Sequence, residues 1–173
     1  GKLRPRDISK LTRVIVHRIE EELGLDAPSL AKAFRDTTKF AAGSYTGGEM
    51  PYSFVLCKNG VWEQALQLGD IGPHAMRYNA EGVGVAIIGD FRHETPTAMQ
   101  WVALVEFVSM LVAFIGLPVD DVLFGHDELV GASKDPNKEC PGKNVDMNEL
   151  RNEVRFTLRA ESSYDLKAAG VLL

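Results

Sequence analysis

The chain has 173 residues, a length that fits one domain with a sizeable hydrophobic core. Its composition is ordinary for a globular protein, with 45% hydrophobic and 25% charged residues and no low-complexity segment. The net charge of −5, without a run of Lys or Arg, argues against nucleic acid as a partner.

Strand and helix signals alternate in the first part of the chain. Residues 13–19 are predicted to form an apolar strand that ends at His17. Ser29 is a suitable cap for a helix over residues 30–41, and the Gly- and Ser-rich segment 43–51 is expected to form a loop.

The middle of the chain carries two further strand signals. Residues 52–56 and 61–65 flank the turn-like Lys58-Asn59-Gly60, which predicts a β-hairpin. Residues 83–88 are apolar on both faces, a pattern typical of a central strand that is covered on both sides.

A long apolar helix is predicted next. Thr95-Pro96 has the form of a helix start, in which the cap is followed by proline at the first helical position. Residues 96–115 are apolar nearly all round, so this helix should be buried. The apolar stretch 101–117 is interrupted by Glu106 and Ser109 and is short for a bilayer, so no membrane span is expected.

The last part of the chain should return to the sheet and end in a helix. After Pro118 a short strand is expected to lead to His126, a long loop to continue to Cys140, and a helix to cover residues 148–159. No repeat or domain linker is visible. The predicted fold class is therefore α/β: one domain over residues 1–173, with its core at about 13–160, the role of the tail 161–173 open, and a central mixed β-sheet flanked by α-helices.

Three residues have side chains suited to a metal ion. His17 and His126 each follow an apolar run, and Cys140 lies in the turn-like Lys138-Glu139-Cys140-Pro141-Gly142. Two imidazoles and one thiolate are ligands that Zn²⁺ accepts, and three protein ligands leave a fourth position for water. This pattern suits hydrolysis better than a structural zinc site, which would need four protein ligands. Cys57 is interpreted as a strand-end residue, and two cysteines are too few to indicate a secreted disulfide scaffold.

Taken in order, six sequence pieces resemble the zinc-dependent N-acetylmuramoyl-L-alanine amidases of the phage-lysozyme and peptidoglycan-recognition-protein type. The resemblance runs from about Arg13 to Leu150. The matching pieces are Val16-His17; Pro51-Tyr52-Ser53-Phe54; Asn59-Gly60; His74-Ala75 followed by Tyr78-Asn79; Val83-Gly84-Val85-Ala86 followed by Gly89-Asp90-Phe91; and Gly125-His126 with Lys138-Glu139-Cys140-Pro141-Gly142.

The resemblance implies a role for each of seven residues. It makes His17, His126 and Cys140 ligands of one zinc ion per chain. It makes Tyr52 and Lys138 the catalytic side chains beside the metal, and it places His74 and Asn79 in the wall of the substrate groove.

This chain also departs from the family's pattern. Arg18 follows the first ligand where a small or polar residue is usual, and the segment 127–139 is longer than the usual spacing. That segment contains Asp135, a rival for the third ligand. Cys140 is preferred because it keeps both the one-residue gap after the lysine and the Pro-Gly that follows.

The function implied by the resemblance is zinc-dependent hydrolysis of the amide between N-acetylmuramic acid and L-alanine in peptidoglycan. The alternative is a peptidoglycan-binding module without catalysis; such members usually lack the third ligand. Peptidoglycan or muropeptides are the expected partners, and a monomer is expected. No signal peptide is visible, which favours an endolysin that stays cytoplasmic until it is released to the cell wall. A chain that begins at Gly1 also fits an exported protein whose leader has been removed.

Overall fold

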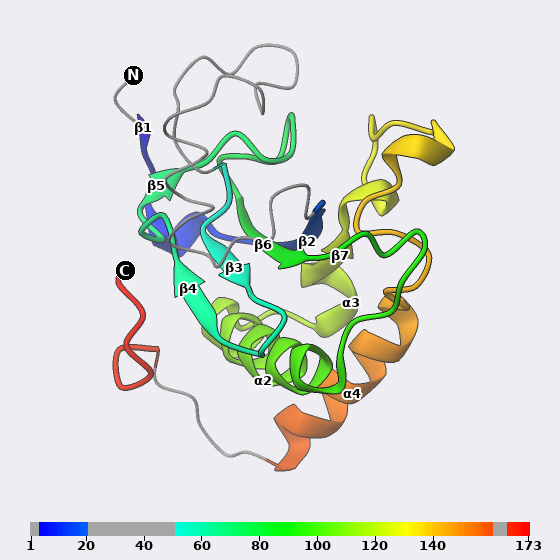
Figure 1. The fold of residues 1–173 in the computed structure, drawn as a ribbon. Helices are drawn as coiled ribbons and strands as arrows, with labels where there is room; N and C mark the ends of the chain where they lie inside the picture. Colours follow the sequence, from blue (N-terminus) through cyan, green and yellow to red (C-terminus); the bar gives the residue numbers. More distant parts are fainter. Residues whose placement is uncertain (1–3, 21–50, 161–165) are drawn as a thin grey trace.

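The computed structural model describes residues 4–20, 51–160 and 166–173 (Figure 1). The helix expected over residues 30–41 and nearly all of the loop expected over 43–51 lie outside these ranges.

The sheet is mixed, as predicted, and it has five strands in the order β4-β3-β6-β2-β7. The strands are β2 (Arg13–Ile19), β3 (Phe54–Leu56), β4 (Trp62–Gln64), β6 (Gly82–Ile88) and β7 (Leu123–Gly125). β6 is parallel to β2 and β3, β7 is parallel to β2, and β4 pairs with β3 in the predicted antiparallel hairpin. A second, two-stranded sheet joins β1 (Arg4–Pro5) to β5 (Asp70–Ile71).

β6 is the predicted central strand, and all of its residues are buried. The predicted bounds 13–19 match β2, but the expectation that this strand ends at His17 is wrong by two residues. β2 continues to Ile19 because its parallel pairing with β6 continues to Ile88. His17 therefore lies inside a strand, paired with Ala86 of β6 and one residue beyond the pairing of Val16 with Gly125 of β7.

The main hydrophobic core lies between one face of the sheet and two helices, α2 (Ala98–Ile115) and α4 (Met147–Ala160) (Figure 1). β2 contributes Val14 and Val16 to this core, and β6 contributes Val83, Val85 and Ile87. Successive strand residues point to opposite faces, so the residues between them face the other way. That second face carries Ile15, His17 and Ile19 of β2, and there the functional side chains gather.

α2 differs from its prediction at both its start and its surface. Thr97, not Thr95, caps it, because the Thr97 side chain accepts from Gln100 N–H and the Gln100 side chain accepts from Thr97 N–H. The helix is buried on one face only, and Met99 and Val102 are exposed. By length and composition alone, its 18 residues, with mean hydropathy 1.9, could cross a membrane. The sequence argument that this apolar stretch is too short for a bilayer is therefore wrong. Packing of the buried face on the sheet and on α4 accounts for this apolar character.

Two elements near the C-terminus complete the core. A short helix, α3 (Val119–Val122), precedes β7 where only a strand was expected, and α4 matches the predicted last helix closely. In the tail, Leu166 and Val171 are buried in the main core. Leu172 exchanges hydrogen bonds with the side chain of Gln64 on the edge strand β4.

Candidate metal centre

Two parallel strands bring the histidines together. Val16 of β2 pairs with Gly125 of β7, so the residues that follow, His17 and His126, lie side by side. Their ring centroids are 4.6 Å apart. His126 begins the short 3-10 helix η3 (His126–Glu128), directly after β7.

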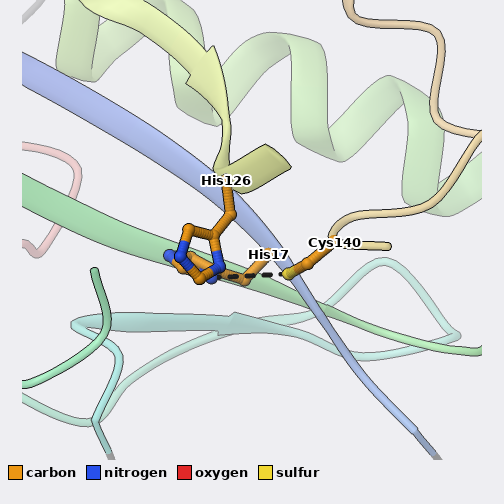
Figure 2. A group of neighbouring side chains, drawn as sticks. All are labelled: His17, His126 and Cys140. Carbon is orange, nitrogen blue, oxygen red and sulfur yellow. Dashed lines mark hydrogen bonds between the residues drawn. The ribbon is translucent and has the colours of Figure 1, made fainter. Parts of the chain in front are cut away.

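The third donor comes from a loop. Cys140 follows the 3-10 helix η4 (Pro136–Lys138), and its Sγ lies 3.5 Å from His17 Nδ1 (Figure 2). One donor atom from each of His17, His126 and Cys140 lies within 4.8 Å of the others, so the three could hold a metal ion. We call this group the metal centre. Both cysteines are outside disulfides.

The Pro-Gly after Cys140 fits a tight backbone approach. Gly142 has φ +105°, and a Cβ at this position would lie 2.6 Å from the Phe91 carbonyl carbon. Only glycine tolerates both constraints. The Cys140 carbonyl also accepts from the Asp127 N–H, which ties the loop to η3. The rival ligand Asp135 is exposed and caps η4 by accepting from Asn137 N–H.

His74 contacts a ligand residue directly. Its Nδ1 is 3.0 Å from His17 Nε2, and its Nε2 is 3.2 Å from the Gly82 carbonyl oxygen. A carbonyl can only accept, so His74 Nε2 carries the hydrogen and its Nδ1 must accept from His17 Nε2–H. With its hydrogen on Nε2, His17 has a lone pair on Nδ1, and this atom faces the Cys140 sulfur. We call the chain of hydrogen bonds from Gly82 through His74 to His17 the tautomer relay. His74 is therefore a neighbour of a ligand as well as part of the expected groove wall.

Two glycines of β6 allow close approach on this face, and Gly84 makes room for the His74 ring. A Cβ on Gly84 would lie 2.8 Å from the Cγ of His74, and one on Gly82 would lie 2.8 Å from the Ile15 Cδ1. The Gly-Val-Gly pattern in an otherwise apolar strand was a visible signal that another group approaches this face closely.

Burial sets the protonation of the donors. Desolvation holds the pKa of His17 well below its ordinary value, and it lowers the pKa of His126 too. Desolvation also raises the pKa of the Cys140 thiol to about 12, against an opposing effect of a hydrogen bond from the Arg18 backbone and of the Arg18 charge. Neutral imidazoles have the lone pairs that a metal needs, and a bound cation would favour the thiolate.

Tyr52 lies beside the metal centre, as expected. Tyr52 comes two residues before β3 begins, and its ring centroid is 4.9 Å from that of His17. Burial is the largest cause that raises the pKa of its hydroxyl, and nearby Cys140 adds to it. The hydroxyl therefore keeps its proton and is able to donate a hydrogen bond at neutral pH.

Lys138, unlike Tyr52, lies on an exposed loop. It is the last residue of η4, two positions before Cys140, and its side chain is exposed. None of the hydrogen bonds or ion pairs among the described residues joins its ammonium group to the metal centre. The structure therefore puts Lys138 on the loop that carries Cys140, with its charge on the solvent side of that loop.

A cavity of about 350 Å³ opens next to the metal centre. His74, Asn79 and His126 line one side, and residues 129–133 line another. The Asn79 side chain accepts from Ala75 N–H at 2.6 Å, which fixes the turn that forms the wall. The exposed apolar side chains of Met76 and Val130 at its rim had no sequence signal that marked them.

Sequence comparison identifies one family. The family model described as N-acetylmuramoyl-L-alanine amidase matches residues 8–143. An N-acetylmuramoyl-L-alanine amidase of Sus scrofa is 27% identical over 141 residues, which are 81% of this chain and 22% of that protein. Peptidoglycan-recognition protein LB of Drosophila melanogaster is 27% identical over 133 residues, which are 75% of this chain and 53% of that protein. This chain thus spans less than two thirds of either curated relative.

A solved structure shares the fold. It is that of the endolysin N-acetylmuramoyl-L-alanine amidase LysCS from Clostridium intestinale URNW, with a TM-score of 0.69 and 18% identity. The match covers 90% of this chain and 91% of that one, so nearly the whole architecture is common to both.

Proposed function

Since a model of the N-acetylmuramoyl-L-alanine amidase family matches residues 8–143, this chain belongs to that family, and we propose that it is a zinc-dependent amidase of peptidoglycan. The bond cleaved is the amide between the lactyl group of N-acetylmuramic acid and the L-alanine of the stem peptide. The observation that carries the proposal is the convergence of His17, His126 and Cys140 beside a cavity.

The donor geometry supports zinc as the metal. Tetrahedral zinc, with Zn–S of about 2.3 Å and Zn–N of about 2.0–2.1 Å, sets sulfur and nitrogen roughly 3.5 Å apart. The Cys140 Sγ and His17 Nδ1 are separated by 3.5 Å. A soft thiolate with two imidazoles also suits zinc better than magnesium or calcium, which prefer oxygen ligands. One zinc per chain follows from one such group among the described residues.

The side chains around the metal centre divide the work of hydrolysis. Bound zinc would supply a water with a pKa near 7 instead of about 15.7 and would polarise the scissile carbonyl. Tyr52, protonated and next to His17, can donate to the oxygen of the tetrahedral intermediate or pass a proton to the leaving nitrogen. Lys138 would bring a positive charge to the oxyanion when substrate fills the site. The cavity lined by His74, Asn79 and His126 would hold the substrate around the amide.

Recognition without catalysis is the alternative, because several curated relatives are named peptidoglycan-recognition proteins. The Cys140 thiol separates the two functions. A module that only binds has no need of a complete set of metal donors, whereas this chain places all three within 4.8 Å.

Digestion of purified peptidoglycan tests the proposal. New L-alanine amino termini without new reducing sugar ends are expected, and a chelator should stop their release. New reducing ends would indicate a glycosidase instead. Binding to peptidoglycan without any new ends would favour the recognition function.

The biological setting belongs to the proposal as well. We propose an endolysin that acts as a monomer and meets peptidoglycan after release from the cytoplasm. The fold shared with the endolysin LysCS supports this setting.

A His74 variant should alter the affinity for zinc. In His74→Gln the tautomer relay from Gly82 to His17 is broken, so the Kd for zinc should rise by about 10–100-fold, as for other groups that orient a metal ligand. Competition with a chromophoric chelator measures this Kd. Asn79→Ala is the matched control, because Asn79 lines the same cavity without contacting a ligand and should change KM while leaving zinc affinity intact. A normal zinc Kd with an altered KM in His74→Gln would limit His74 to the groove wall.

A further inference from the structure

We propose that Arg18 and Arg92 are positioning residues that hold the loop carrying Lys138 and Cys140 in its working geometry. We call the pair the guanidinium clamp. The inference rests on the proposed function for the role of Lys138, while the part that concerns Cys140 depends only on metal binding.

The clamp grips the backbone on both sides of Lys138. Arg18 Nε donates to the Glu139 carbonyl at 2.6 Å, and Arg92 Nη1 donates to the Asn137 carbonyl at 2.6 Å. Arg18 Nη2 also approaches the Asn137 carbonyl, at 3.5 Å. Glu139 is the residue directly before Cys140, so the position of its carbonyl fixes the peptide that leads into the thiol.

Two carboxylates hold the guanidinium groups in place. Glu20 Oε1 accepts from Arg18 Nη1 at 2.5 Å and from Arg92 Nη2 at 2.7 Å. The two oxygens of Asp90 accept from Arg92 Nε and Nη2, and Asp90 Oδ1 lies 3.3 Å from Arg18 Nη1. Two positive and two negative charges balance, and only 8% of the Arg18 side chain is exposed.

The clamp is built at the C-terminal ends of two interior strands, β2 and β6. Arg18 lies in β2, and Asp90 comes two residues after β6, whose last residue, Ile88, pairs with Ile19. The loop itself has little support of its own, because residues 133–138 are exposed and η4 has only three residues. The hydrogen bonds from Arg18 and Arg92 therefore fix the loop backbone relative to the sheet.

Arginine suits this task better than lysine. One planar guanidinium reaches a backbone carbonyl with Nε and a carboxylate with Nη1 at fixed relative angles, whereas a single ammonium cannot hold both in that geometry. This accounts for Arg18 at the position after the first ligand, where the family resemblance leads one to expect a small or polar residue.

The two arginines should have separable effects. Arg18→Ala frees the peptide before Cys140, so we expect the Kd for zinc to rise by about 10-fold or more and kcat to fall. Arg92→Ala removes the short hydrogen bond to the peptide before Lys138 and leaves the Arg18 hydrogen bond to the Glu139 carbonyl in place, so kcat should fall by about 10-fold while the zinc Kd stays within about twofold. KM should change little in both, because neither arginine lines the cavity.

Zinc Kd, kcat and KM are measured on wild type, both alanine variants and Arg155→Ala. Arg155 forms an exposed ion pair with Asp120 away from the metal centre, which makes it the matched control. Millimolar guanidinium or ethylguanidinium should restore part of the lost zinc affinity of Arg18→Ala, an effect that a folding defect would not give. If Arg18→Ala does not fold, Arg18→Lys and Arg92→Ala carry the test.

Wild-type values of zinc Kd and kcat in both Arg18→Ala and Arg92→Ala would overturn the clamp. The zinc titration needs no substrate. If wild type failed to cleave peptidoglycan, the proposed function would fall, and the effect of Arg18 on zinc binding would still be decided.

Discussion

Cys140→Ser should lose both bound zinc and amide hydrolysis while the domain stays folded. A serine hydroxyl is a poor zinc ligand compared with a thiolate, and two histidines alone would hold the ion weakly. Losing the metal removes several kcal/mol of transition-state stabilisation, which corresponds to about 10³-fold or more in rate. The fold should persist because the main core lies on the opposite face of the sheet, against α2 and α4. Zinc per chain after dialysis, release of amino termini and circular dichroism measure the three effects.

Cys57→Ser is the control for this variant. Cys57 is buried just after β3 and lies outside the metal centre, so zinc should remain bound. If Cys140→Ser kept one zinc per chain and hydrolysed peptidoglycan at the parental rate, Cys140 would not be the third ligand.

Lys138→Ala should keep zinc and lose about two to three orders of magnitude in kcat. Once substrate fills the site, a donor held against the developing oxyanion contributes roughly 3–4 kcal/mol, and removing the ammonium leaves the metal ligands untouched. Because the charge is needed only in the transition state, kcat and kcat/KM should fall together. Steady-state kinetics on a soluble muropeptide, with zinc content measured in the same samples, check this.

Lys134→Ala is the matched control for the charge. It removes a second exposed lysine of the same loop, whose ammonium group donates to the Asp127 carbonyl at 3.4 Å. Lys134→Ala should retain most of the activity. Equal losses in the two variants would mean that loop charge in general, not the ammonium of Lys138, is responsible.

Sequence periodicity was enough to predict most strands of the sheet, whereas the family resemblance implied that the two histidines meet at one metal ion. The apolar runs before His17 and His126 indicate strands, and parallel pairing of β2 with β7 then places the two rings side by side. The hairpin and the fully buried β6 were likewise predicted, because turn residues and two-sided apolar character are local signals. The start of α2 was predicted two residues too early. Thr95 and Thr97 are both acceptable N-caps on sequence alone, and only the hydrogen bonds between Thr97 and Gln100 show which one caps the helix.

Interactions that depend on backbone groups far apart in the chain could not be predicted. Arg18 binds a carbonyl 121 residues away, and every residue has a carbonyl, so no residue type marks the partner. The contact of His74 with His17 also requires the space above Gly84. A His74 that only lined the groove wall would leave zinc binding unchanged when substituted, whereas its contact with His17 predicts weaker zinc binding.

Titration of metal-free protein with zinc tests the central claim most directly, with release of L-alanine amino termini from peptidoglycan as the readout. The account predicts no activity without metal, a linear rise on adding zinc and a sharp break at one equivalent per chain. Full activity in protein that has been stripped of metal, or no activity at any zinc level, would contradict it.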